Sequence, residues 1–195
     1  MATNIEKIKT LRQMTGGGVL DCKQALDEAD GDIEEAAQIL RQQGFSEAAE
    51  KADRVVEEGC VDTYIHTDSK LGSLIQVNCE TDFVARTEEF RSLCHDLAMQ
   101  VAATAPQWVS REDIPEEVIE EQTQKYLSEI EEDKPEHILE RIVEGKLNKF
   151  CQERCLLEQP FIRDDEKTIQ QLITEMIAET GENIVIKRFA RFNIE

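Results

Sequence analysis

Hydrophobic positions recur at two different spacings along this chain, and the spacing changes near residue 58. Before that point, apolar residues recur every three or four positions, which is the period of an amphipathic helix. Three short helical faces are marked by Ile5, Ile8, Leu11, Cys22, Ala25, Leu26, Ala29, Ile33, Ala36, Ala37 and Leu40. This pattern predicts a compact bundle of three helices.

Glycines and polar residues at the expected positions separate these helices. The three glycines at 16–18 predict a turn after the first helix. Asp32, followed by Glu35 at the third helical position, is typical of a capping box at the start of the third helix. Gly44 is expected to end that helix as a C-cap residue. The Ala-, Glu- and Lys-rich stretch 46–56 then predicts a separate linker helix.

From residue 58 the period becomes two, which indicates half-buried strands. Val61, Thr63 and Ile65 alternate with polar residues, and a turn-like stretch follows at 67–70. A second strand is marked by one face of alternate residues, Leu71, Ser73, Ile75, Val77 and Cys79. Two such strands joined by a short polar turn predict an antiparallel hairpin.

Helical spacing returns after the hairpin. Apolar residues over 90–101, 118–130 and 138–151 predict three helices, and those over 169–177 predict a fourth helix that ends at Gly181. The segment 112–140 contains twelve Asp and Glu residues but two Lys. We expect this acidic segment to be a solvated helix face and not a ligand site.

The last residues, 184–194, alternate again and predict a third strand. One of its faces is expected to carry Ile184, Ile186, Arg188, Ala190, Phe192 and Ile194, and the other Lys187, Phe189 and Arg191.

These elements together predict an α+β fold. An N-terminal three-helix bundle would occupy residues 1–45, a linker helix 46–57, and a core of three antiparallel strands packed with helices 58–195. A bundle of fewer than about 50 residues is marginally stable alone, so we expect it to serve as a docking unit.

Charge and composition narrow the classes of function. The net charge of −20 over 195 residues argues against direct nucleic-acid binding, because phosphate contacts need clustered Lys and Arg. No apolar run approaches the roughly 18 residues that a membrane span needs, and no secretory signal is evident. The six scattered cysteines are expected to be free thiols. We expect a cytoplasmic protein with protein partners and no membrane contact.

Residue patterns for catalysis or metal binding are missing from the sequence. The glycines at 16–18 are not followed by the Gly-Lys-Ser/Thr of a phosphate-binding loop. Cys79, Cys94 and His95 could surround a metal, but no pair at metal-ligand spacing supports such a site. We therefore expect no catalytic residue, no metal and no cofactor, and a protein that is not an enzyme.

The segment Thr81–Val84 lies where the second predicted strand meets the next helix. Such a corner can present Asp82 and Phe83 outward on a rigid base. Two simpler roles stay open on residue type alone. Thr81 or Asp82 could cap the helix, and Phe83 could fold back into the core.

Two long segments resemble the signatures of the elongation factor Ts family. Residues 77–86 (VNCETDFVAR) match one signature almost completely, and residues 15–23 (TGGGVLDCK) are similar to the other, TGAGMMDCK. Gln-Pro-Phe at 159–161 and the tail from Gly181 agree with the family too. The resemblance runs from end to end of the chain.

The resemblance implies a guanine-nucleotide exchange factor for elongation factor Tu, the GTPase of translation elongation. Asp82 and Phe83, flanked by Thr81 and Val84, would reach the nucleotide-binding domain of that partner near its magnesium site. The phenyl ring would wedge between helices, disturb magnesium coordination and weaken the binding of GDP, so that GTP can bind. The exchange factor would need no cofactor of its own.

The family also implies that the N-terminal bundle is ubiquitin-associated-like (UBA-like) and holds the same domain of elongation factor Tu. Val19, Leu20 and Lys23 occupy its contact positions, with Val19 and Leu20 in place of a Met pair. Burial of Val19 and Leu20 inside the bundle is the alternative.

A single copy of the family's core implies a homodimer and a two-plus-two complex with elongation factor Tu. The bacterial cytoplasm is the expected location, with the plastid stroma as an alternative. A rival interpretation is an adaptor that docks partners through the bundle, in which Asp82 and Phe83 are only cap and core.

Overall fold

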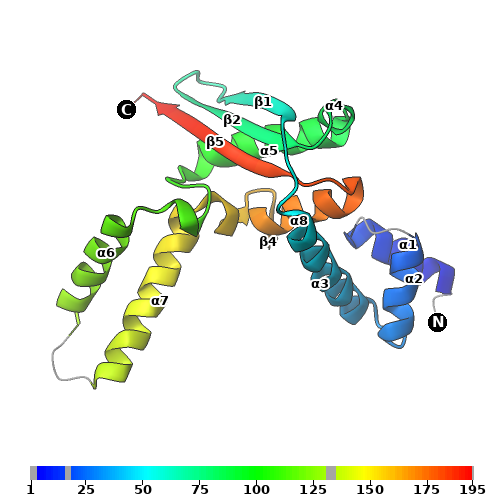
Figure 1. Ribbon diagram of the computed structural model, residues 1–195, viewed down its shortest axis with the longest axis horizontal. Coiled ribbons are helices and arrows are strands. Elements are labelled where there is room, and N and C mark those ends of the chain that lie inside the picture. Colours follow the sequence, from blue (N-terminus) through cyan, green and yellow to red (C-terminus); the bar gives the residue numbers. More distant parts are fainter. Residues whose placement is uncertain (1–3, 16–18, 131–134, 195) are drawn as a thin grey trace.

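A three-stranded antiparallel sheet lies at the top of the molecule in Figure 1, with helices against one face and two helical arms extending below it. The computed structural model describes residues 4–15, 19–130 and 135–194. Its strands are β1 (Glu58–Ile65), β2 (Leu71–Cys79), β3 (Pro160–Phe161), β4 (Asp164–Thr168) and β5 (Val185–Asn193). Its helices are α1 (Asn4–Thr15), α2 (Val19–Glu28), α3 (Ile33–Lys51), α4 (Asp82–Ala85), α5 (Glu88–Thr104), α6 (Glu116–Ser128), α7 (Glu136–Arg154) and α8 (Ile169–Thr180), with short 3-10 helices η1 (Arg111–Asp113) and η2 (Leu156–Glu158).

The predicted hairpin and third strand form this sheet in the order β1–β2–β5. Strands β1 and β2 pair from Glu58 opposite Cys79 to Ile65 opposite Gly72, and β5 pairs antiparallel with β2. The α+β class and the three antiparallel strands are therefore confirmed.

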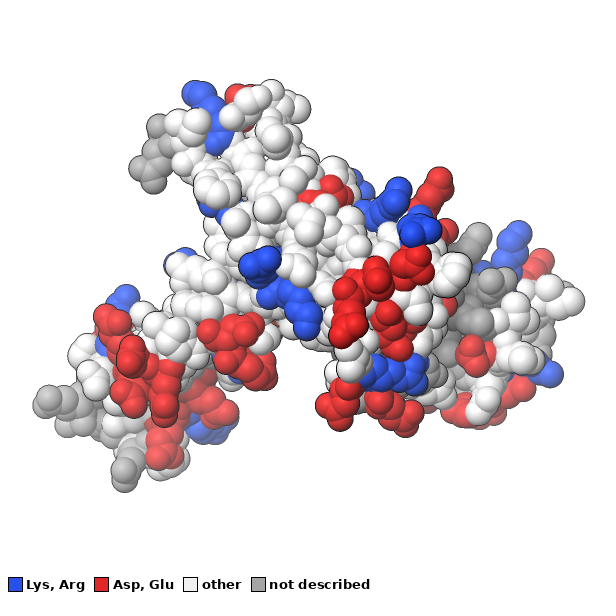
Figure 2. Space-filling model, turned by 45° about the horizontal axis from the view of Figure 1, so that its top comes forward, with Lys and Arg blue, Asp and Glu red and all other residues white. Residues whose placement is uncertain are grey.

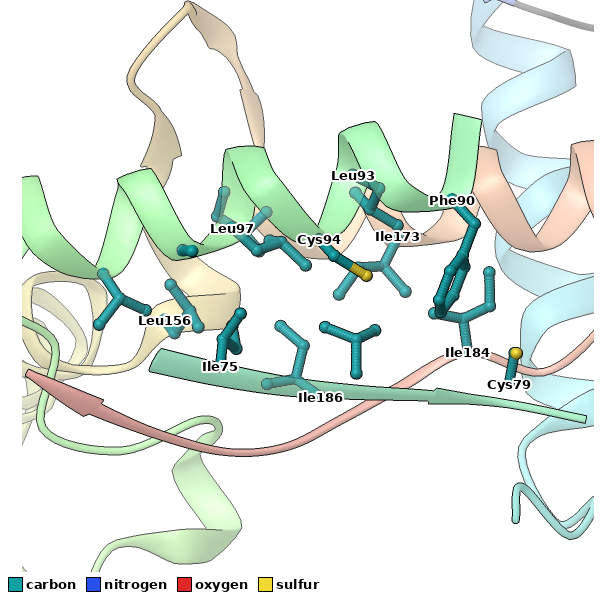
Figure 3. Packing of buried hydrophobic residues seen from close by; sticks show 14 of the residues in the cluster. Ile75, Cys79, Phe90, Leu93, Cys94, Leu97, Leu156, Ile173, Ile184 and Ile186 are labelled. Carbon is teal, nitrogen blue, oxygen red and sulfur yellow. The ribbon is translucent and has the colours of Figure 1, made fainter. Parts of the chain in front are cut away.

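The inner face of the sheet packs against α5 and α8 to form the main core (Figure 3). Alternate β2 residues Ile75, Val77 and Cys79 are fully buried, as the period of two predicts. Phe90 and Leu97 on α5 are fully buried opposite them. Each such large apolar side chain contributes roughly 1.5–3 kcal/mol by leaving water, so this layer anchors whatever is attached to its edges.

The expected faces of β5 are wrong beyond its first residues. Gln76 pairs with Arg188, but the next β2 residue, Val77, pairs with Ile186, so Lys187 is an extra residue in a β-bulge. The bulge reverses the alternation. Ile186 is buried in the core, whereas Ala190 and Phe192 lie on the opposite, outer face with Leu74.

Helices α1, α2 and α3 form the three-helix bundle with a small core of its own, which confirms the three helices, although Ile5 of the first predicted face is 79% exposed and lies outside that core. Asp32 caps α3, because its Oδ1 accepts hydrogen bonds from the amides of Glu34 and Glu35 at 2.9 and 3.0 Å. The bundle core is made of the buried residues Leu11, Cys22, Ala25, Leu26, Ala29, Ala36 and Ala37. The predicted turn at 16–18 lies outside the described residues.

Gly44 does not end α3, which continues as one helix to Lys51 in place of a separate linker helix. The reason is the packing of α3 on α8. Gly44 lies against Thr174 of α8, and a Cβ placed at Gly44 would meet Cγ2 of Thr174 at an ordinary 3.5 Å, so the packing on α8 continues past this glycine without needing it. The third helix therefore runs from the bundle to the core.

Helices α6 and α7 form the second arm, at the lower left in Figure 1. Its base is a small cluster of Ile114, Cys151 and Cys155, with Trp108 and Phe150 packed against it. Acidic side chains gather on this arm in Figure 2. The carboxylates of the first two turns of α6 are exposed, which confirms the predicted solvated acidic face for this helix, whereas residues 131–134 of the acidic segment lie outside the described residues; the exposed carboxylates are those of Glu116, Glu117, Glu120 and Glu121.

Candidate partner-binding surfaces

The corner between β2 and α4 is shaped by Thr81. Its backbone is extended, with φ −125° and ψ 155°, and its hydroxyl accepts a hydrogen bond from the amide of Val84 at 3.4 Å. Thr81 is thus the N-cap of α4, which confirms the capping role and assigns it to Thr81 and not to Asp82. A second cap, Thr87, starts α5 immediately afterwards.

Phe83 is exposed at this corner. Its exposed fraction is 79%, whereas the neighbouring Val84 packs against the main core. The alternative that Phe83 folds back into the core is therefore wrong. A capped turn of helix whose other side is fixed to the core presents this phenyl ring to solvent.

Asp82 lies next to the ring and pairs with Arg86 one turn later, at 2.9 Å between Oδ2 and Nη2. Both side chains are substantially exposed, so the pair contributes little to stability. The Asp82 carboxylate can therefore exchange Arg86 for a donor on a partner at low cost. The structure brings Thr81, Asp82, Phe83 and Val84 together at one corner, as their adjacency requires.

Glu182 is a residue of the corner that the sequence did not predict. It lies in the turn between α8 and β5, yet its carboxylate accepts hydrogen bonds from the amides of Glu80 and Thr81 at 3.1 and 3.0 Å. It also accepts the Thr81 hydroxyl at 2.6 Å. No local signal identifies such a partner about a hundred positions away, although Gly181 predicts the end of α8 that places it.

The buried thiol of Cys79 lies on the inner side of the corner and contacts it. It donates to the carbonyl of Thr81 at 3.2 Å. Burial raises the pKa of the Cys79 thiol to about 11, and the Glu182 carboxylate adds to this rise. The thiol stays protonated near neutral pH and is available as a donor.

Val19, Leu20 and Lys23 lie on the first turns of α2 in the bundle, on an arm separate from the corner (Figure 1). Val19 is 53% exposed and Leu20 80% exposed, so the alternative that both are buried in the bundle is wrong. Lys23 is also exposed. Two adjacent exposed aliphatic residues beside a Lys form an apolar surface with a cationic edge.

The outer face of the sheet is a third apolar surface. None of the helices described for the chain covers it in Figure 1, and large apolar side chains from all three strands or their ends are exposed on it or beside it. They are Val61, Ile65, Leu74, Phe192 and Ile194. Period-two spacing predicts the alternation of β1 and β2, but the bulge in β5 is needed to bring Phe192 to this face.

Cys79, Cys94 and His95 do not form a metal site with other residues: within 4–15, 19–130 and 135–194, no group of three or more His, Cys, Asp or Glu side chains has suitable geometry. Among the helices described for the chain, none is both long and apolar enough to cross a membrane. The six cysteines are free thiols.

Comparison with known proteins agrees with this arrangement over the whole chain. The family model described as elongation factor TS matches residues 1–194. The chain belongs to the elongation factor Ts family. Elongation factor Ts of Thermotoga neapolitana is 53% identical over 194 residues, covering 100% of this chain and 98% of that protein.

Two further elongation factors Ts are similarly close. That of Thermodesulfovibrio yellowstonii is 52% identical over 194 residues, which cover 100% of this chain and 97% of the relative. That of Moorella thermoacetica is 53% identical over 188 residues, which cover 96% of this chain and 93% of the relative. Likeness to the elongation factor Ts family thus spans the bundle, the sheet and the acidic arm.

Proposed function

We propose that this chain is a guanine-nucleotide exchange factor that acts on elongation factor Tu. The observation that carries the proposal is the exposed ring of Phe83 on a capped helix fixed to the core. Phe is usually buried, and aromatic side chains are enriched at protein interfaces, so an aromatic ring held in solvent on a fixed turn fits a binding role. Family membership supports elongation factor Tu as the partner.

The proposed mechanism is a wedge and not a chemical reaction. Phe83 inserts between helices of the nucleotide-binding domain while Asp82 reaches the neighbourhood of its magnesium ion, and Thr81 and Val84 hold both in place. Magnesium neutralises phosphate charge, so a shift in its coordination weakens GDP binding. The chain binds the nucleotide-free partner better than the GDP-bound one, and this difference in affinity drives release.

The bundle at residues 1–45 supplies affinity in this scheme. We propose that it is UBA-like and that Val19, Leu20 and Lys23 hold the nucleotide-binding domain while the corner acts. Their exposure supports this role. Exchange on a GTPase requires no catalytic residue, metal or cofactor in the factor itself, so the chain is not proposed as an enzyme.

The core at residues 58–195 is proposed to be the dimerisation domain, giving a two-plus-two complex with elongation factor Tu. The exposed apolar outer face of the sheet supports this, because a second copy would remove it from water. The bacterial sources of the relatives support a place in the bacterial cytoplasm, with the plastid stroma as the alternative.

Release of a fluorescent GDP analogue from elongation factor Tu, in excess GDP and magnesium, tests the exchange proposal. We expect strong acceleration by the parent and about 30-fold less by Phe83→Ala, since a hot-spot side chain contributes about 2 kcal/mol. Leu127→Ala, which truncates an exposed apolar side chain on α6, is the matched control and should keep full activity. No acceleration by the parent would overturn the proposal and favour the adaptor interpretation.

Light scattering tests the dimer. Leu74 pairs with Thr63 on one side and Ala190 on the other, so it lies at the middle of the outer face. The parent should have twice the mass of one chain, and Leu74→Glu should be a monomer because a charge cannot be buried unpaired at the contact. Leu127→Glu, which changes a similarly exposed leucine, should remain dimeric. A monomeric parent would contradict the dimer.

A further inference from the structure

The turn between α8 and β5 is the main polar support of the Phe83 corner. Its Glu182 uses both carboxylate oxygens: Oε2 accepts the amides of Glu80 and Thr81, and Oε1 accepts the Thr81 hydroxyl. Hydrogen bonds to an ionised carboxylate are roughly twice as strong as neutral ones. Three of them converge on two consecutive residues immediately before α4.

The bond to the Thr81 hydroxyl also sets the cap of α4. Because the hydroxyl proton points to Glu182, an oxygen lone pair is left to accept the amide of Val84. Without Glu182, the Thr81 hydroxyl is free to rotate and the Thr81 backbone, whose carbonyl also accepts the amide of Ala85 at 3.2 Å, loses its anchor, so the first turn of α4 is held less firmly. The direction of Phe83, which lies inside that turn, therefore depends on a carboxylate that belongs to another element.

Glu80, in turn, accepts a hydrogen bond from the turn that contains Glu182. Its Oε1 accepts the amide of Asn183 at 2.7 Å, and Arg54 approaches the same oxygen at 3.4 Å. Glu80 and Glu182 thus each bind backbone amides of the opposite segment. Such a reciprocal pair resists rotation of one segment against the other, since no single bond can act as a pivot.

Asn183 connects this turn to the arm that carries the bundle. Its side chain is buried, and Nδ2 donates to the carbonyls of Ala52 and Arg54, both at 3.1 Å. These carbonyls belong to the chain as it leaves α3. Helix α3 also packs along α8, at Gly44 and Thr174. Two consecutive residues of one turn therefore hold the base of the Phe83 corner and the exit of the bundle arm.

We propose that Glu182 and Asn183 are positioning residues, which fix the Phe83 corner and the bundle arm in one geometry for a single partner. The proposal rests on the exchange function proposed above. Glu182 acts on the rate of nucleotide release through Phe83, and Asn183 acts on affinity through the placement of the bundle. Neither residue is in the segment that carries the wedge.

The first experiment is a double-mutant cycle in the GDP-release assay with the full chain. Glu182→Ala should lower the maximal release rate by about tenfold, because small misplacements of an acting group have effects of that size or larger. In a Phe83→Ala background, Glu182→Ala should have a much smaller effect, since the main residue through which it acts is gone and only the placement of Asp82 is left to disturb. Glu182→Gln, which keeps one carbonyl acceptor, should restore part of the rate.

Glu179→Ala is the matched control, because Glu179 is an exposed carboxylate on the last turn of α8, three residues earlier. It should leave release unchanged. Equal losses from Glu182→Ala in the parent and Phe83→Ala backgrounds would mean a general structural role, and the proposal would be wrong. Chemical unfolding of each variant identifies any that fails to fold, in which case Glu182→Gln carries the cycle.

A second cycle tests Asn183. Asn183→Ala should raise the half-saturating concentration of the factor by several-fold, and this rise should disappear when Leu20→Ala has already removed the bundle contact. A fall in the maximal rate at unchanged half-saturation would contradict the assignment of Asn183 to the bundle arm.

Amide hydrogen exchange separates this proposal from the exchange function itself. Glu182→Ala should speed exchange of the Val84 and Ala85 amides about tenfold or more while the β1–β2 amides stay protected. This readout needs no elongation factor Tu. If the parent does not accelerate GDP release but the amide exchange changes as expected, the proposed function is wrong and the positioning role is kept. If those amides remain protected in Glu182→Ala, the positioning role fails whatever the parent does.

Discussion

The Phe83 corner and the N-terminal bundle both present apolar side chains to solvent, but they are held in different ways. The corner is fixed by charge-assisted hydrogen bonds between segments about a hundred residues apart, next to the main core. The bundle is held by local contacts in a small cluster of mostly Ala, Leu and Cys. One polar contact between its helices joins Lys7 Nζ to the carbonyl of Gly31 at 2.6 Å, across only 24 positions of sequence.

The contrast separates two mechanical requirements. A side chain that must push a partner's helices apart needs a base that does not yield, which distant contacts to a large core provide. A surface that only has to hold a partner can sit on a small unit with lower stability of its own. Four changes test this division, and the first two compare the cores beneath the two surfaces.

Truncation of Phe90 should have the largest effect. Phe90 is 0% exposed in the main core, so Phe90→Ala should lower the free energy of unfolding by about 3–5 kcal/mol. Phe83→Ala, seven residues earlier, should change it by no more than about 0.5 kcal/mol. Guanidinium unfolding of both variants measures this pair. A comparable loss in Phe83→Ala would mean that the ring supports the fold.

Truncation of Leu26 in the bundle core should cost less and stay local. Leu26 is buried among small residues that can close around a gap, so Leu26→Ala should cost about 2 kcal/mol, at the low end for such a change. Amide exchange should rise in α1 and α2 and remain slow in the sheet. Faster exchange in the sheet as well would show that bundle and core unfold as one unit.

Truncation of Leu20 should affect binding alone. At 80% exposure Leu20 contributes little to folding, and Leu20→Ala should raise the half-saturating concentration for GDP release about tenfold, equivalent to about 1.4 kcal/mol. The maximal release rate should not change, because the corner is intact. Ile5→Ala is the control, since Ile5 is 79% exposed on α1 but outside the predicted surface.

The smallest change concerns the helix that joins the two regions. Gly44→Ala in α3 should raise the free energy of unfolding by about 0.5–1 kcal/mol, because Ala favours a helix and its Cβ meets Thr174 at an ordinary 3.5 Å. Thermal unfolding measures the gain. Gly59→Ala is the opposite control: φ there is 146°, and a Cβ would lie 2.2 Å from the carbonyl oxygen of Val77, so this variant should lose stability.

The sequence pattern predicted most of the helices and strands but not all the contacts that join them. The hairpin, the buried face of β2 and the end of α8 at Gly181 follow from spacing and cap residues, and the structure confirms them. The predicted helix end at Gly44 was wrong because the packing of α3 against α8 outweighs the local preference of glycine for a helix end. The β3–β4 pair was missed because the second strand, rich in Asp, Glu and Lys, has no apolar alternation.

The residues of the candidate surfaces were likewise only partly predictable from the sequence. Residue types alone left Phe83 open between core and solvent, and the resemblance to a family pointed to an outward role; the structure exposes the ring. Glu182 could not be found from the sequence, because a lone Glu after a helix has many uses and its partners lie 101 and 102 positions away. Long-range polar contacts of this kind do not affect the spacing of apolar residues from which helices and strands are predicted.

Because β5 contains one extra residue, the number of residues in the strand decides which side chains face the core, more than the identity of the residue at the bulge. Lys187 separates two stretches of opposite alternation: before it Ile186 faces the core, and after it Ala190 and Phe192 face outward while Phe189 packs against the core. Any substitution of Lys187 would preserve that division. A deletion of one residue there would turn Phe192 inward and Ala190 with it, exchanging buried and solvent-facing sides over half the strand. Functional variants of this segment should therefore differ by replacement and not by insertion or deletion.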